Sequence, residues 1–194
     1  MSDHDAFAER GRALEEEYFR KKDRELIEKL RRAAAADQER GELSKQTGVN
    51  DPVLLADLQE IGLTADTVVL LPLVPAVELA WAEGGITPAE RQLVLSLARS
   101  RGITEGSAPD RQLHTWMASR PTPEQFAKAR RLLSALLDSG APIAKDLTAD
   151  QLVKYCEQIA SASGGLFGLP MRAISMEERD LLSRIAADLK SRPS

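Results

Sequence analysis

Apolar residues recur at intervals of three and four along most of this chain, which is the spacing of one helix face. No stretch alternates apolar and polar residues for long enough to predict a strand. We therefore predict an all-α fold, a bundle of about seven helices with a long charged N-terminal helix. The predicted helices cover residues 4–39, 52–61, 66–83, 88–101, 109–118, 123–138, 149–162 and 176–191.

Punctuation residues mark the expected helix ends. Four segments place a hydroxyl residue three positions before Glu or Gln, the spacing of a capping box, in which each side chain bonds the other residue's backbone amide. They are Thr87–Glu90, Thr122–Gln125, Thr148–Gln151 and Ser175–Glu178. Gly62, Gly102 and Gly140 follow helical runs, as left-handed C-caps do.

Residues 3–40 differ from the rest because about half of them are charged. Acids precede bases by four residues, the favourable orientation for ion pairs on a helix. These pairs are Glu16–Arg20, Glu17–Lys21, Glu25–Lys29 and Glu28–Arg32. A narrow apolar stripe comprises Phe7, Leu14, Tyr18, Phe19, Leu26, Leu30 and Ala33. We predict a helical arm that is solvated over most of its surface and buries one seam.

The sequence accordingly divides into an arm of residues 1–40, a linker of residues 41–50 and a bundle of residues 51–194. The linker contains two glycines and small polar residues without periodicity. Asp51 and Pro52 then supply an N-cap and a first-turn proline, which start the compact part.

Composition narrows the classes of function. Hydrophobic residues make up 43% of the chain and aromatic residues 4%, with a net charge of −4. This hydrophobic content suffices for a folded core. The mild acidity argues against a nucleic-acid partner, because such partners usually require a basic surface.

The expected compartment is the cytoplasm. One cysteine, Cys156, and two histidines exclude an internal disulfide and a zinc site built on Cys and His. The acidic start of the chain predicts no signal peptide. The apolar run Thr67–Ala82 contains Glu78 and two prolines and is shorter than the roughly 20 residues that span a bilayer. We predict that this run is a buried helix.

Two segments of the chain echo each other. Ala82–Ala98 and Ser161–Ala186 each contain a helix end, paired glycines, a capping hydroxyl and a second helix. This pattern resembles the tellurite-resistance protein B (TerB-like) family over roughly residues 51–190. The resemblance implies an all-helical bundle linked to tellurite and other chemical stress, with acidic surface residues in metal binding and partners in membrane-associated complexes.

The chain departs from that family where metal chemistry would lie. The family's aspartate before the turn glycine is absent, with Glu83 or Gly84 near it in the first copy and Ser163 in the second. Hard cations require several convergent oxygen ligands, whereas capping already explains Glu90 and Glu178. We therefore predict structural capping at these turns and no metal-ligating residues.

A shorter resemblance covers about 25 residues of the arm. The segment Phe7–Phe19, running on to Leu26, is similar to the opening helix of the small zeta-type inhibitors of bacterial ATP synthase. This resemblance implies a helix that docks on an ATPase. The alternative is a solvated helix held by its own ion pairs.

We find no constellation that predicts catalysis or cofactor binding. His114 lacks a nameable nucleophile or orienting partner, and Cys156 lies in an apolar row with Leu152 and Ile159, where it is most simply a core residue. We predict that the basic pairs Arg99–Arg101 and Arg130–Arg131 lie on solvent-exposed helix faces. The apolar loop of residues 164–170, with Leu166, Phe167 and Leu169, is either tucked over the core or an association surface.

The sequence therefore predicts a non-enzymatic protein-interaction or stress-response module, TerB-like, that binds a protein partner or itself. Two alternatives stay open. One is a regulator of an ATPase through the N-terminal helix, and the other is a metal-binding stress protein.

Overall fold

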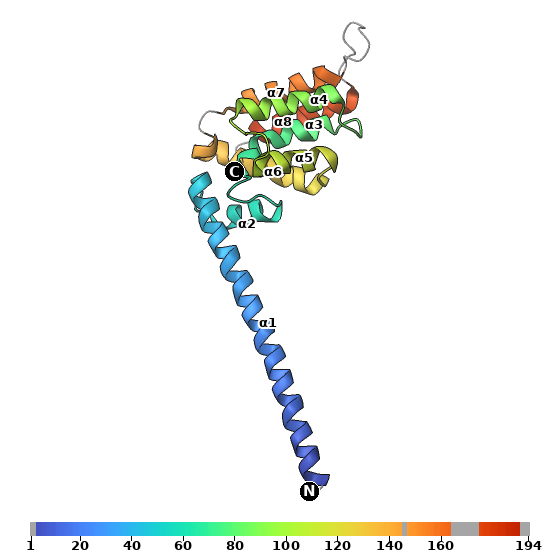
Figure 1. The fold of residues 1–194 in the computed structure, drawn as a ribbon. Helices are drawn as coiled ribbons and strands as arrows, with labels where there is room; N and C mark the ends of the chain where they lie inside the picture. Colours follow the sequence, from blue (N-terminus) through green and yellow to red (C-terminus); the bar gives the residue numbers. More distant parts are fainter. Residues whose placement is uncertain (1–2, 145–146, 164–174, 191–194) are drawn as a thin grey trace. The chain divides into compact units, whose positions relative to one another are not determined.

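The computed structural model describes residues 3–144, 147–163 and 175–190, and for residues 3–14, 144 and 162–163 it describes the backbone alone. These residues form eight α-helices and two short 3₁₀ helices without a strand, which confirms the all-α prediction (Figure 1). The elements are α1 (Asp3–Thr47), α2 (Pro52–Glu60), η1 (Val68–Leu73), α3 (Val74–Ala80), α4 (Pro88–Ser100), α5 (Ala108–Ala118), α6 (Pro123–Ser139), η2 (Pro142–Ala144), α7 (Ala149–Ser163) and α8 (Met176–Lys190). The chain forms two compact units, residues 1–41 and 42–194.

The first unit is the greater part of α1, a single helix whose residues 15–38 are all exposed. Local pairs support its helicity. Two predicted ion pairs are present, Arg20 to Glu16 at 3.6 Å and Arg32 to Glu28, whereas Glu25 pairs with Lys22 at 3.5 Å. The expected buried seam is exposed over the described residues Tyr18 to Leu30. Phe7 and Leu14 lie outside the residues whose side chains are described.

Helix α1 continues into the second unit, so the predicted linker is wrong for residues 41–47. Leu43 and Thr47 are fully buried there. The Thr47 hydroxyl donates to the Leu43 carbonyl at 2.7 Å, and Gly48 ends the helix at a φ of 75°. Burial of Leu43 and Thr47, which lie one turn apart, favours a helical backbone beyond Gly41. This tertiary packing outweighs the low helix propensity of glycine.

Hydroxyl caps start the helices of the second unit as predicted. Each of the four capping boxes forms both of its hydrogen bonds. The Asp51 carboxylate likewise accepts from the Val53 amide at 2.8 Å. These side chains satisfy the backbone amides that a helix N-terminus leaves without partners.

Glycine ends the helices as predicted. Gly62 and Gly102 have φ values of 81° and 79°. The amides of the next residues, Leu63 and Ile103, bond back to carbonyls five residues earlier at 3.0 and 3.1 Å. Both apolar side chains are buried. This combination is the Schellman motif with its hydrophobic contact.

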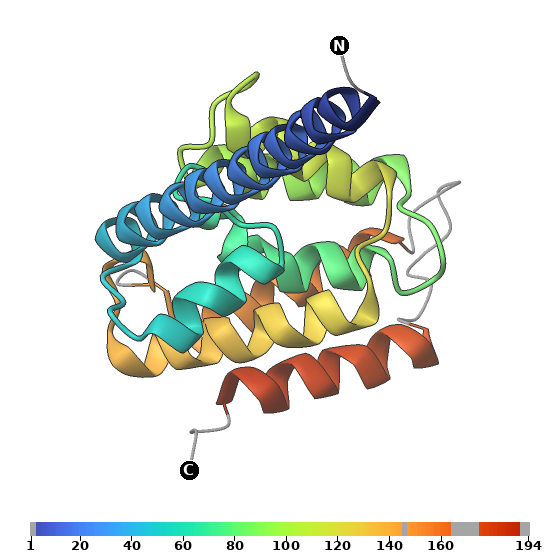
Figure 2. The same ribbon diagram turned by 90° about the horizontal axis from the view of Figure 1, so that it is seen from below.

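Helix α3 forms the centre of the second unit, and residues 70–80 are all buried. It packs against α4, α6, α7 and α8, and α6 also contacts α2 and α8 on either side (Figure 2). The run predicted as one helix over 66–83 is divided into η1 and α3. Pro72 and Pro75 lack the amide donors that an uninterrupted α-helix would use.

A buried ion-pair triad joins three helices around this core. The Arg130 guanidinium of α6 bonds Glu78 of α3 and lies 2.7 Å from the Asp188 carboxylate of α8. Burial raises the pKa of Glu78, and the hydrogen bond from Arg130 opposes that shift. The Glu78 and Arg130 side chains are 10% and 11% exposed, whereas the Asp188 side chain is 40% exposed. The buried part of the triad is therefore the Glu78–Arg130 pair, and loss of either partner would leave the other buried without its counter-charge.

Candidate functional site

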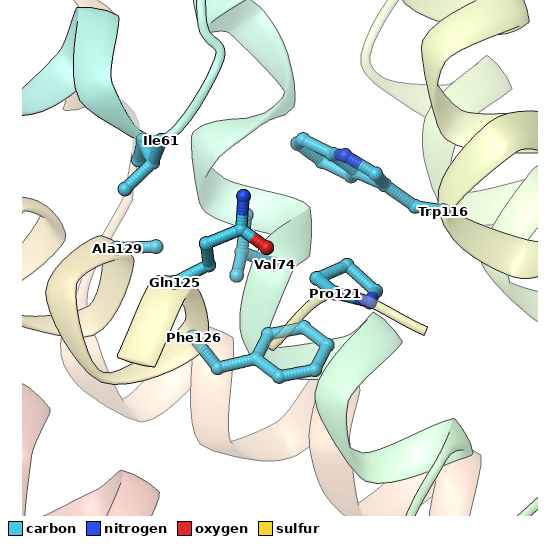
Figure 3. Close-up of a pocket in the computed structure, with 7 residues that line it drawn as sticks. All are labelled: Ile61, Val74, Trp116, Pro121, Gln125, Phe126 and Ala129. Carbon is cyan, nitrogen blue, oxygen red and sulfur yellow. The ribbon is translucent and has the colours of Figure 1, made fainter. Parts of the chain in front are cut away.

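An apolar pocket lies at the junction of α2, α3, α5 and α6 in the second unit. Its lining residues are Ile61, Val74, Trp116, Pro121, Gln125, Phe126 and Ala129. Figure 3 shows the rings of Trp116, Pro121 and Phe126 around the side-chain amide of Gln125. The pocket has a volume of only about 20 Å³, close to the space that one water molecule needs.

The chemistry of this pocket is apolar contact. Gln125 is its one polar side chain, and the Gln125 Oε1 atom already accepts from the Thr122 amide at 2.9 Å. The Trp81 indole Nε1 donates to the Trp116 backbone carbonyl at 2.9 Å, which helps to fix the position of Trp116. The volume of this pocket is far below the roughly 300–1,000 Å³ of ligand pockets, and the lining residues carry no titratable group.

The second candidate is the apolar face of α1. Five large hydrophobic side chains of this helix have exposed fractions between 47% and 62%. They are Tyr18, Phe19, Leu26, Ile27 and Leu30. Solvent exposure of several large apolar groups along one helix makes this face a candidate interaction surface.

His114 lies on the exposed side of α5, with its Nε2 atom 3.8 Å from an Asp110 carboxylate oxygen. That carboxylate is engaged elsewhere, because it accepts from the Gly106 amide at 2.9 Å and pairs with Arg99 at 2.7 Å. The pKa of Asp110 is lowered most by the hydrogen bond from the Gly106 amide and next by the hydrogen bond from Arg99. The arrangement is a capped loop stabilised by an ion pair, in which the Ser107 hydroxyl accepts from the Asp110 amide and donates to the Thr104 carbonyl.

Cys156 is a core residue, as its apolar row predicted. Its side chain is fully buried on α7, with Leu152 and Ile159 also buried. Burial raises the pKa of the Cys156 thiol to about 12. A thiol in this state is a poor nucleophile.

The two echoed capping boxes come close enough to interact. Glu90 and Glu178 are both buried, and each accepts from the amide of its own cap residue. Burial raises the pKa of Glu90, and the charges of Glu178 and Glu83 add to that shift. Among the described residues, no group of three or more Asp, Glu, His or Cys side chains gathers in a way that would hold a metal ion.

The basic pairs named from the sequence serve partly in internal contacts. Arg130 belongs to the buried triad, and Arg99 bonds both Asp110 and the Ile103 carbonyl. Arg131 is exposed. The predicted surface around Leu166, Phe167 and Leu169 lies outside the described residues.

The sequence predicts the stripe on α1 without Ile27, and it does not predict the pocket. The pocket's residues come from four separate elements between Ile61 and Ala129. No local motif connects them, so the sequence offers no signal for their convergence.

Comparisons with protein-family models, curated proteins and solved structures found no match to this chain. None of the helices in the described part of the chain combines the length and hydrophobicity required to cross a lipid bilayer.

Proposed function

We propose that this chain is a non-enzymatic interaction module that binds another protein through the apolar face of α1. The exposure of Tyr18, Phe19, Leu26, Ile27 and Leu30 along one helix carries the proposal. An amphipathic helix that places such a face in a partner's groove is a recurring mode of recognition. The bundle of the second unit then serves as the folded body.

The proposal is supported by the chemistry of the described side chains. Cys156 is buried with a raised pKa, and the carboxylate beside His114 is committed to a backbone amide and to Arg99. The large exposed hydrophobic groups instead gather on α1. The resemblance to TerB-like proteins points in the same direction, towards a helical module that acts through partners.

Site-specific photo-crosslinking of the full-length chain tests this function. A benzophenone amino acid at Leu30 samples the apolar face, and the same group at Lys21 samples the opposite face of the helix. We expect protein adducts from Leu30 and few from Lys21, with mass spectrometry identifying the partner. Absence of adducts from Leu30, or equal adducts from both positions, would contradict the proposal.

A second candidate, regulation of an ATPase, is favoured by one specific observation. The segment that resembles zeta-type inhibitors lies in an uninterrupted helix, with Tyr18, Phe19 and Leu26 exposed. We expect the full-length chain to inhibit ATP hydrolysis by a bacterial F1-ATPase, and Phe19→Asp to reduce that inhibition. Unchanged hydrolysis at a large excess of the chain would remove this candidate and leave the first in place.

A further inference from the structure

The apolar face of α1 has the spacing of a seam that pairs with another helix. Phe19, Leu26 and Ala33 are seven residues apart, and Leu30 follows Leu26 by four. Because a helix turns about 100° per residue, these side chains fall on one side. In heptad terms Leu30 takes an a position and the other three take d positions.

Basic side chains border this seam on both sides. Arg20 takes an e position, and Lys22 and Lys29 take g positions, from which side chains reach the flank of a paired helix. The Arg20 and Lys22 side chains are 71% and 56% exposed. Residues 20–32 contain seven bases and three acids, a net charge of +4.

Carboxylates on the same helix offset only part of this charge. Glu16 lies 3.6 Å from Arg20, and Glu25 lies 3.5 Å from Lys22. Exposed pairs of this kind contribute about 0–1 kcal/mol and are screened by salt. Glu15, Glu16 and Glu17 lower the net charge of residues 15–32 to +1. The basic character offered to a partner is therefore local to the flanking positions of Arg20, Lys22 and Lys29.

A second copy of the chain is a poor occupant of this seam. An antiparallel pairing that places Phe19 opposite Leu30 sets Lys22 of one copy beside Lys29 of the other. A parallel pairing in register stacks Asp23 on Asp23. Both arrangements bring like charges together, which destabilises a helix pair.

We infer that the partner of α1 is a different protein that presents an apolar groove or helix face bordered by carboxylates. Acidic flanks would complement Arg20, Lys22 and Lys29. Asp23 lies in the seam between Phe19 and Leu26, so a polar or basic group at that level of the partner fixes the register. This inference rests on the proposed function and adds the chemistry of the partner.

Two designed peptides test the inference with the full-length chain. Both are about three heptads long, with Leu at core positions and one core Lys to face Asp23. One peptide has Glu at all flanking positions and the other has Lys. We expect fluorescence anisotropy to show at least about tenfold tighter binding of the Glu-flanked peptide in low salt, with the difference shrinking as salt rises.

Charge reversal sharpens the test. The triple variant Arg20→Glu, Lys22→Glu, Lys29→Glu should exchange the preference between the two peptides. Its matched control, Lys21→Glu, Arg24→Glu, Arg31→Glu, changes the net charge equally away from the seam flanks and should keep the original preference. Leu26→Asp with Leu30→Asp should abolish binding. Circular dichroism verifies that each variant keeps its helical content.

Several outcomes would overturn the inference. These are equal binding of both peptides, the same loss in the control triple variant, self-association of the full-length chain in sedimentation, or binding to phosphatidylglycerol vesicles without binding to the Glu-flanked peptide. Protein crosslinks from Leu30 without any peptide preference would keep the proposed function and overturn this inference alone. Absence of crosslinks would contradict the function itself.

Discussion

Helices α1 and α3 are helical for different reasons. In α1, residues 15–38 are exposed and rich in Glu, Lys, Arg and Ala, so helix propensity and ion pairs between neighbouring turns stabilise it locally. Helix α3 contains a proline and two valines, and every one of its residues is buried. Its conformation depends on the helices packed around it. The side chains of α1 over residues 15–38 face solvent, whereas those of α3 are all engaged in packing.

The largest expected difference between α1 and the buried core is in the reaction rate of a cysteine thiol. With a pKa raised from 9.0 to about 12, Cys156 has a thiolate fraction about a thousandfold below that of a free thiol at pH 8. We expect Cys156 to react with a disulfide reagent only after the chain unfolds. A cysteine placed on α1, as Lys21→Cys in a Cys156→Ala background, should react at the rate of a free thiol. Rapid native labelling of Cys156 would contradict the described core.

Removal of a charged side chain should also cost much more stability in the core than on α1. Arg130→Met leaves Glu78 buried without its partner, so we expect the free energy of unfolding to fall by about 3–5 kcal/mol. The matched control, Arg32→Met on α1, breaks an exposed pair with Glu28 and should cost less than about 1 kcal/mol. Urea denaturation of both variants measures the difference. The double variant Arg130→Met, Glu78→Met should recover part of the lost stability.

Truncation of leucine gives a similar contrast without charge. Leu133 of α6 is buried at 1% exposure, so Leu133→Ala should lower the free energy of unfolding by about 2–5 kcal/mol. Leu30→Ala on α1 should change it by less than about 0.5 kcal/mol. Equal losses from the two variants in denaturant melts would show that α1 packs in solution and that its apolar face is not free.

The smallest expected effect concerns the capping box of α4. Burial raises the pKa of Glu90, so the folded chain holds this proton more tightly than the unfolded chain. Stability therefore falls as pH rises from the ordinary value of about 4.3 through the raised pKa. Gln keeps the cap, as Gln125 and Gln151 do in two other boxes. Glu90→Gln should flatten this part of the pH dependence in denaturant melts, whereas a steeper dependence would contradict the shift.

Much of the fold could be predicted because the residues that start and end a helix are close together in the sequence. A cap such as Thr87–Glu90 or a stop such as Gly102 acts within a few residues, so its sequence pattern is sufficient. Two predictions were wrong for different reasons. Burial of Leu43 in tertiary packing carries α1 past Gly41. The run over 66–83 is instead divided by local proline chemistry, with Pro72 inside the 3₁₀ segment and Pro75 in the first turn of α3.

The candidate sites were predictable to different degrees for the same reason. The stripe on α1 is periodic within one element, so the sequence shows its members, although not whether they are covered. The pocket of Ile61, Val74, Trp116 and Phe126 depends on how four elements converge. Residues that converge in this way show no periodic pattern in the sequence.

Gly41 lies within α1 at the boundary of the two compact units, and nothing approaches the position where its Cβ would be. A glycine inside a helix costs about 0.5–1 kcal/mol relative to alanine, because it restricts the unfolded backbone less. Gly41 therefore lowers the local helix stability between the exposed residues 15–38 and the buried Leu43. Alanine at this position should raise the stability of this turn by a similar amount.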